Sequence, residues 1–177
     1  MKLTAHKGLF MKRIKIFVIV FAALCTLAAC GAKREQTVAG TCTLSISCQT
    51  LADAPEKCKA DKRELIPADG WILPEETVEF YEGESVFDVL LRETKNHKIH
   101  MEYSETPLYQ VAYIEGIGNL YEFDAGETSG WMYSVNGWFP NYGCSKYAVA
   151  DGDVIAWVYT CDLGQDVGGG DAAGAQQ

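Results

Sequence analysis

The chain has 177 residues, of which 15 are Lys or Arg and 24 are Asp or Glu, so its formal net charge at pH 7 is −9. This excess of negative charge disfavours nucleic acid and anionic lipid surfaces as electrostatic partners. The length suits one domain that has a hydrophobic core of its own.

The first 29 residues have the composition of a secretory signal. They contain five basic residues and no acidic residue, and an apolar run follows from Ile16 to Cys25. The run is shorter than the roughly 20 residues that a membrane-spanning helix needs, and the small-residue sequence Leu27-Ala28-Ala29-Cys30 comes after it. Leu-Ala-Ala-Cys resembles the bacterial lipobox, which implies cleavage before Cys30 and a lipid on that residue. The alternatives are an ordinary signal peptide or an uncleaved anchor.

Cleavage before Cys30 would leave 177 − 29 = 148 residues, with 10 basic and 24 acidic side chains and a net charge of 10 − 24 = −14. On this interpretation residues 1–29 are the signal peptide, 30–37 are the lipidated cysteine and a tether, 38–167 are the domain, and 168–177 are a disordered Gly/Ala/Gln tail. We expect the lipid on Cys30 to hold the protein on the extracytoplasmic face of the cell membrane. Whether this is an inner or an outer membrane stays open.

The pattern after the tether is mostly that of strands. Apolar residues at every second position predict a first strand over 42–48 with one buried face. Asp53 and Glu56 predict the start of a short polar helix. The segment 71–81 predicts one or two strands interrupted at Pro74, because proline cannot donate a hydrogen bond to a central ladder.

The clearest helix is predicted over 85–97. Ser85 is suited to cap it, with Asp88 three residues further on. Val86, Val89 and Leu90 then form an apolar stripe at helical spacing.

Strand candidates follow at 99–105, 108–114 and 120–123, and after them come two aromatic hairpins. The first hairpin is centred on Asn136-Gly137, the pair favoured in type I′ turns. The second is centred on residues 151–153 and leads into an apolar run over 154–159. One helix among many strands predicts an α+β fold, a β-rich single domain in which one main helix lies on a β-grasp-like mixed sheet. The order of the strands stays open.

Three segments resemble the transcobalamin-like C-terminal domain family, bacterial surface domains similar to the smaller domain of animal cobalamin carriers. They are Glu82–Leu90, Tyr113–Gly118 and the aromatic-rich stretch Gly126–Asp166. The resemblance implies a binding module with cobalamin or a related corrinoid as its ligand. In the animal carriers this domain covers one side of cobalamin and a larger helical domain holds the other. This chain is too short to contain that helical domain, so a transporter or surface protein is the implied partner.

The aromatic rings are the candidate ligand-binding residues. Trp138 and Phe139 are adjacent in the sequence and therefore point in opposite directions, so at least one is expected at the surface. Tyr142 follows in a loop, and Trp131 suits either the surface or the core. We therefore predict that Trp131, Trp138, Phe139 and Tyr142 bind a flat ligand. The alternative is a protein–protein interaction or adhesion module without a small ligand, for example one that adds a strand to a partner.

Five cysteines remain outside the signal and the lipobox: Cys42, Cys48, Cys58, Cys144 and Cys161. Five is odd, so at least one thiol is free or pairs with another chain. Cys144 and Cys161 flank the second turn and are the favoured disulfide pair, with Cys48 as the rival partner. The spacings do not match a structural zinc site, and His97 and His100 lie in a charged stretch. We therefore predict no metal site. We also predict no catalytic residue and, from the negative net charge, no nucleic-acid partner.

Overall fold

A computed structural model describes residues 37–106 and 111–174. The predicted signal peptide, the tether up to residue 36 and Cys30 lie outside the described residues. Within the described ranges, no helix combines the length and the apolar character that crossing a bilayer requires.

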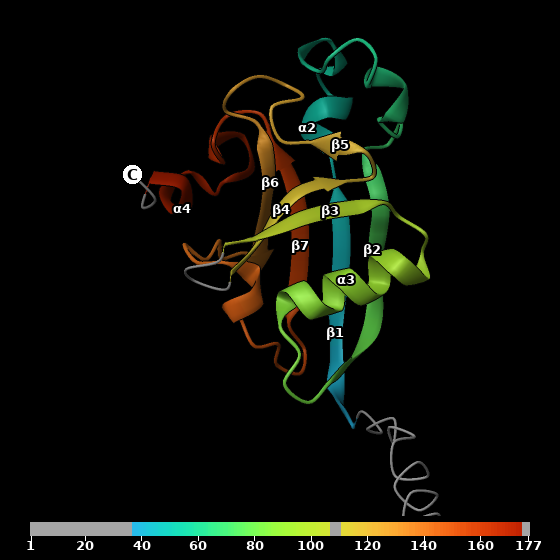
Figure 1. Cartoon of the computed structure of the whole chain (residues 1–177), viewed down its shortest axis with the longest axis vertical. Helices are drawn as coiled ribbons and strands as arrows, with labels where there is room; N and C mark the ends of the chain where they lie inside the picture. Colours follow the sequence, from blue (N-terminus) through green and yellow to red (C-terminus); the bar gives the residue numbers. More distant parts are fainter. Residues whose placement is uncertain (1–36, 107–110, 175–177) are drawn as a thin grey trace, which may run out of the picture. The chain divides into compact units, whose positions relative to one another are not determined.

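In the described part of the chain, four strands form a mixed sheet (Figure 1). Strand β1 (Val38–Ser47) pairs antiparallel with β2 (Trp71–Tyr81) on one side and parallel with β7 (Val154–Thr160) on the other. Strand β6 (Gly130–Val135) pairs antiparallel with β7, so the strand order is β2-β1-β7-β6. This sheet, with its parallel central pair, is the predicted β-grasp-like mixed sheet.

Helix α3 (Val86–Asn96) crosses one face of this sheet and confirms the predicted main helix. The side chain of Ser85 accepts a hydrogen bond from the backbone of Asp88, and the Asp88 carboxylate accepts one from the backbone of Ser85, which is the predicted capping box. Val86, Val89 and Leu90 are fully buried. They pack on sheet residues such as Leu44 and Trp157 and so attach the helix to the sheet.

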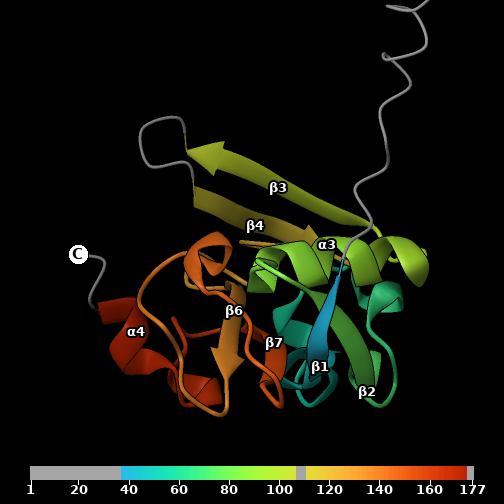
Figure 2. The same cartoon turned by 90° about the horizontal axis from the view of Figure 1, so that it is seen from below.

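A second sheet covers the same face of the first sheet beside α3 (Figure 2). It contains, among the described residues, strands β3 (Met101–Thr106), β4 (Val111–Ile117) and β5 (Leu120–Tyr121). Buried residues of β4, including Ala112 and Ile114, belong to the same core cluster as α3 and the four-stranded sheet. The core therefore lies between the four-stranded sheet and a layer made of α3 and the second sheet.

Two local predictions about the first half of the chain are corrected by the structure. Pro74 does not interrupt β2, which is continuous over Trp71–Tyr81. It lies at an irregularity of an edge strand, between the pairs Leu44↔Glu76 and Ile46↔Leu73, where its missing N–H removes no ladder bond. Asp53 starts no α-helix either, because it ends the short helix α2 (Gln49–Ala52), and Pro55–Lys57 form a 3₁₀ turn.

The two aromatic turns form where predicted, but they do not belong to two separate hairpins. Strands β6 and β7 pair with each other, and both turns lie in the connection between them. The Asn136-Gly137 turn is followed by a single bridge between Val135 and Trp138 instead of a strand.

Residues 168–174 of the predicted C-terminal tail belong to the described part of the chain. Residues Gly170–Gly174 form a short helix, α4, in which Ala172 is buried. Gly169 lies so close to Phe139 and Met132 that a Cβ there would come within 2.8 Å of the Phe139 ring. Small residues permit this approach. Residues 175–177 lie outside the described part.

The predicted disulfide between Cys144 and Cys161 is not formed. All five cysteines of the described residues are free and buried. Cys144 belongs to the core beneath α3, whereas Cys161 belongs to a second cluster with Cys48, Cys58 and Tyr159. The two residues do flank a turn, but the chain between them crosses from one cluster to the other, so their side chains do not face each other.

Candidate functional site

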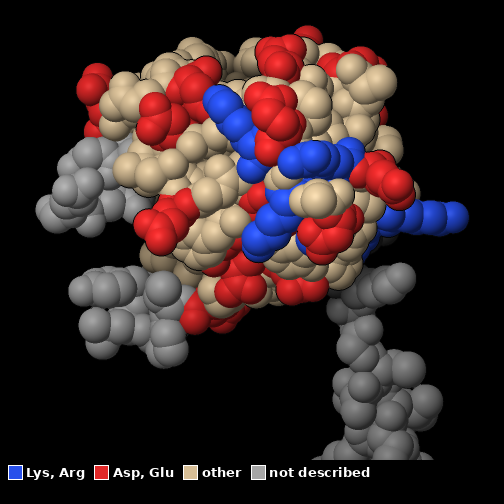
Figure 3. Space-filling model, turned by 90° about the horizontal axis from the view of Figure 1, so that it is seen from above, with Lys and Arg blue, Asp and Glu red and all other residues tan. Residues whose placement is uncertain are grey.

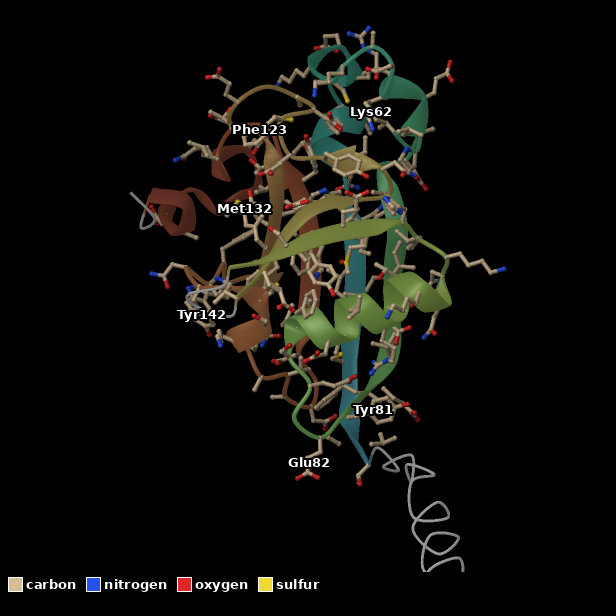
Figure 4. All side chains as sticks on the ribbon, in the orientation of Figure 1. Lys62, Tyr81, Glu82, Phe123, Met132 and Tyr142 are labelled. Carbon is tan, nitrogen blue, oxygen red and sulfur yellow. The ribbon has the colours of Figure 1, made fainter. Side chains whose placement is uncertain are left out.

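Two exposed aromatic rings lie close together where β6 ends and the connection to β7 begins. Trp138 is 55% exposed and Tyr142 is 41% exposed. Their ring centroids are 6.2 Å apart, and the ring of Tyr142 stacks on that of Tyr147 at 6.3 Å with an interplanar angle of 13°. We call Trp138, Tyr142 and Tyr147 the aromatic surface. Figure 4 shows Tyr142 at the margin of the molecule.

The turn that presents Trp138 is held at both ends. Asn136 and Gly137 have φ angles of 53° and 78°. A type I′ turn, which the Asn-Gly pair predicts, requires two positive φ angles of this kind. Val135 and Trp138 exchange backbone hydrogen bonds of 2.9 and 3.0 Å. The Asn136 side chain donates to the buried carboxylate of Asp153 at 2.8 Å. The turn is therefore a fixed support for the exposed indole of Trp138.

A buried tyrosine supports the second ring. Tyr133 is 7% exposed, and its hydroxyl donates a hydrogen bond of 2.9 Å to the backbone carbonyl oxygen of Tyr142. The Tyr133 ring lies 5.5 Å from the core ring of Trp157 and 6.5 Å from Tyr147. Burial raises the pKa of Tyr133, which keeps the hydroxyl protonated as a donor. A continuous series of rings thus connects the core to the aromatic surface.

The loop that carries Tyr142 also docks on β4. A Cβ at Gly143 would lie 1.9 Å from a methyl carbon of Val111, so only glycine permits this approach. The Ala112 N–H donates to the Ser145 hydroxyl at 3.1 Å. The buried Cys144 thiol lies 3.7 Å from the carbonyl oxygen of Ala112. The position of Tyr142 is therefore set by the core, by β6 and by β4 together.

The structure brings together two of the four predicted ligand-binding residues, Trp138 and Tyr142. Trp131 is half-buried, its indole N–H donates to the carbonyl oxygen of Leu120 at 2.9 Å, and its ring meets Tyr159 edge-on at 5.3 Å. Phe139 is half-buried, and its ring lies against Gly169. The rings of Trp131 and Phe139 therefore contact other residues of the domain and do not join Trp138 and Tyr142.

Tyr147 is a member of the aromatic surface that the sequence did not single out. It follows the 3₁₀ turn Cys144–Lys146, and its carbonyl oxygen accepts a hydrogen bond from the backbone of Val86 at 3.0 Å. Burial, Asp153 and Tyr142 raise the pKa of its hydroxyl. An aromatic residue five positions after Tyr142 carries no periodic signal in a loop, so only the fold could bring the two rings together.

Basic side chains gather at a different place. Figure 3 shows Lys and Arg among Asp and Glu on the upper end of the molecule, where the segment around Lys62 lies in Figure 4. Lys59 pairs with the buried carboxylate of Asp124 at 3.0 Å, and Lys62 donates to the carbonyl oxygen of Asn119 at 3.0 Å. Arg63 donates to the carbonyl oxygens of Glu56 and Cys58. These cations hold the local chain together, and no ligand is needed to explain them.

A protein-family model matches the part of the chain that contains the aromatic surface. Residues 83–161, fewer than half of the chain, match a domain of unknown function (DUF4430). No curated protein matches the chain.

The solved structures that are similar to the chain include the following two. One is a candidate metal-binding protein from Ruminococcus gnavus, with 17% identity over 68% of this chain and 96% of that chain and a TM-score of 0.41. The other is haptocorrin in complex with Cbi, with 16% identity over 72% of this chain and a TM-score of 0.47. The match spans 27% of the haptocorrin chain.

Proposed function

We propose that this protein is a binding module, not an enzyme, that holds a flat ligand against the aromatic surface formed by Trp138, Tyr142 and Tyr147. The observation that carries the proposal is that Trp138 is 55% exposed while its backbone and its ring neighbour Tyr142 are both held in place. An exposed indole on a fixed support offers large contact area, and little conformational entropy is lost on binding.

The first ligand to test is a corrinoid such as cobalamin. The support is the resemblance of Glu82–Leu90, Tyr113–Gly118 and Gly126–Asp166 to transcobalamin-like C-terminal domains, since the last of these segments contains the whole aromatic surface. A single exposed surface covers one side of a macrocycle. We therefore include in the proposal a second surface protein or a transporter that covers the other side.

The proposal places the module outside the cytoplasm and on the membrane. The basic segment, the apolar run and the sequence Leu27-Ala28-Ala29-Cys30 support a cleaved signal and a lipid on Cys30. Several acyl chains hold a protein stably, because each buried CH₂ contributes about 0.8 kcal/mol.

The test is a titration of the purified full-length protein in detergent with cobinamide and cobalamin, followed by tryptophan fluorescence and corrected for absorption by the corrin. We expect saturable quenching that is lost in Trp138→Ala. Phe123→Ala is the matched control, because Phe123 is 52% exposed and lies outside the aromatic surface. Quenching that is unchanged in Trp138→Ala would contradict the proposed site, and no saturation at millimolar ligand would contradict corrinoid binding.

A protein–protein interaction module is the second candidate function, and one observation favours it. Strand β3 is at the edge of its sheet, and residues 102–105 are exposed along it. Such an edge can pair with a strand from a partner. If the corrinoid titration shows no binding, photo-crosslinking from position 104 on intact cells is the corresponding experiment. A discrete crosslinked protein would support this function, and crosslinks to lipid or water alone would contradict it.

A further inference from the structure

We propose that Glu76, Glu93 and His97 form a binding site for a divalent cation of the Zn²⁺ class, between β2 and the C-terminal end of α3. One potential ligand atom of each residue lies within 4.8 Å of the corresponding atoms of the other two. His97 Nε2 and Glu76 Oε1 are 2.6 Å apart. This site is separate from the aromatic surface, and its function does not depend on corrinoid binding.

Secondary structure places the three side chains together. Glu93 and His97 are four residues apart at the end of α3, so they lie on the same side of the helix, one turn apart. Glu76 comes from the edge strand β2, just after the irregularity at Pro74. Helix and strand therefore each contribute ligands from a fixed backbone, which is a better basis for a metal site than a loop.

Glu93 is the residue that most needs an explanation. It is only 7% exposed, although burial of a carboxylate is costly unless the charge is paired. Its oxygens accept hydrogen bonds from Arg92 Nε at 2.8 Å and from Asn96 Nδ2 at 2.9 Å. An ionised carboxylate has about four acceptor positions, so both oxygens keep the capacity to bind a cation. Arg92 and Asn96 orient the group in the way that hydrogen-bonding partners commonly orient metal ligands.

The local charge balance also favours a cation. Within the described ranges, the ion pairs at this place join three carboxylates, those of Glu76, Glu84 and Glu93, to the guanidinium of Arg92 and the imidazole of His97. Arg92 is shared between Glu84 and Glu93, so one permanent positive charge faces two of the carboxylates, and the third pairs with histidine. A divalent cation between Glu76 and Glu93 would offset the remaining negative charge.

The donor set indicates which cation fits. One imidazole nitrogen and two carboxylate oxygens suit Zn²⁺ and similar ions, whereas Ca²⁺ takes oxygen ligands. Ligands of a tetrahedral zinc ion are on the order of 3.3 Å apart, so the contact between His97 and Glu76 must widen when the ion enters. Their side chains are 37% and 33% exposed, which leaves room for this movement. Water would supply the fourth ligand.

The test uses metal-stripped full-length protein and Co²⁺, which reports its own coordination in visible absorption and can be displaced by Zn²⁺. We expect saturation at one equivalent and displacement by Zn²⁺. His97→Gln and Glu76→Gln should each weaken Co²⁺ binding by more than about 100-fold, since losing even a residue that merely orients a ligand costs about 10–100-fold. The matched control is His100→Gln, because His100 is also an exposed histidine bonded to a glutamate, Glu102. Its affinity should equal that of the unchanged protein.

Three outcomes would overturn the proposal. The first is no saturable absorption at millimolar Co²⁺. The second is undiminished affinity in His97→Gln. The third is an intense sulfur-to-cobalt charge-transfer band, which would assign the ion to cysteine thiols. Glu93→Gln is not the deciding variant, because it deprives Arg92 of a partner and so affects folding. His97 and Glu76 are partly exposed, so thermal unfolding can show that their variants remain folded.

Discussion

The hydroxyl of Tyr133 donates a hydrogen bond of 2.9 Å to the backbone carbonyl oxygen of Tyr142. The donor is a buried residue of β6, and the acceptor belongs to the residue whose ring is 41% exposed. This bond connects the core of the four-stranded sheet directly to the proposed binding surface. The arrangement of the exposed rings therefore depends on a residue that no ligand would touch.

Tyr133→Phe tests this connection. The variant keeps the ring and removes one hydrogen bond, so we expect the free energy of unfolding to fall by about 1 kcal/mol. Ligand binding should weaken as well, because Tyr142 loses its support. The measurements are urea unfolding and the corrinoid titration. Tyr113→Phe is the control, because Tyr113 is 48% exposed. Equal effects of the two variants would show that the bond to Tyr142 has no special role.

Trp138 and Trp157 should respond oppositely to truncation. Trp138 is 55% exposed, so Trp138→Ala should change the free energy of unfolding by no more than about 0.5 kcal/mol while abolishing binding. Trp157 is 2% exposed, so Trp157→Ala should cost about 3–5 kcal/mol. Urea unfolding of both variants measures the difference. Unfolding caused by Trp138→Ala would assign that residue to the core and remove it from the site.

Gly143→Ala should displace the loop that carries Tyr142. The added Cβ would lie 1.9 Å from Cγ1 of Val111, and overpacking of this kind costs about 1–3 kcal/mol. The double variant Gly143→Ala with Val111→Ala is the control, because the nearest remaining side-chain atom, Val111 Cβ, would be 3.3 Å away. We expect ligand binding to fall in the single variant and to recover in the double variant. Failure to recover would place the constraint at another contact.

Stability should decrease at alkaline pH because of the buried thiols. Burial raises the pKa of Cys42 from its ordinary value of 9.0 to about 11, and those of Cys48 and Cys144 to about 12. Between the ordinary pKa of 9.0 and the raised pKa of about 11 to about 12, the folded protein binds more protons than the unfolded chain. The free energy of unfolding therefore falls as the pH rises through this range. The contribution is complete below pH 9 and is lost progressively towards pH 12.

Urea unfolding between pH 7.5 and 11, with a reducing agent present, measures this dependence. Cys42→Ala should make the decrease less steep, because one of the thiols with a raised pKa is absent. An unfolding midpoint that stays constant above pH 9 would contradict the prediction.

The features that the sequence predicted correctly are local ones. Helix α3 was recognised because Ser85 and Asp88 satisfy the first backbone N–H groups, and because Val86, Val89 and Leu90 recur at helical spacing. The Asn136-Gly137 turn was recognised because few residue pairs adopt two positive φ angles easily. The α+β class is predicted because the sequence has one clear helix pattern among several strand patterns. Exposure of Trp138 followed from its place beside the turn.

Other features depend on residues far apart in the sequence. The parallel pairing of β1 with β7, the contact of Tyr142 with Tyr147 and the separation of Cys144 from Cys161 have no local pattern that specifies them. The same holds for the proximity of Glu76 to Glu93 and His97. Periodicity and capping report the conformation of a few neighbouring residues, whereas these contacts form only when the hydrophobic faces of distant elements pack together. Local patterns therefore predict the main helix, the Asn136-Gly137 turn and the α+β class, whereas packing decides which side chains meet.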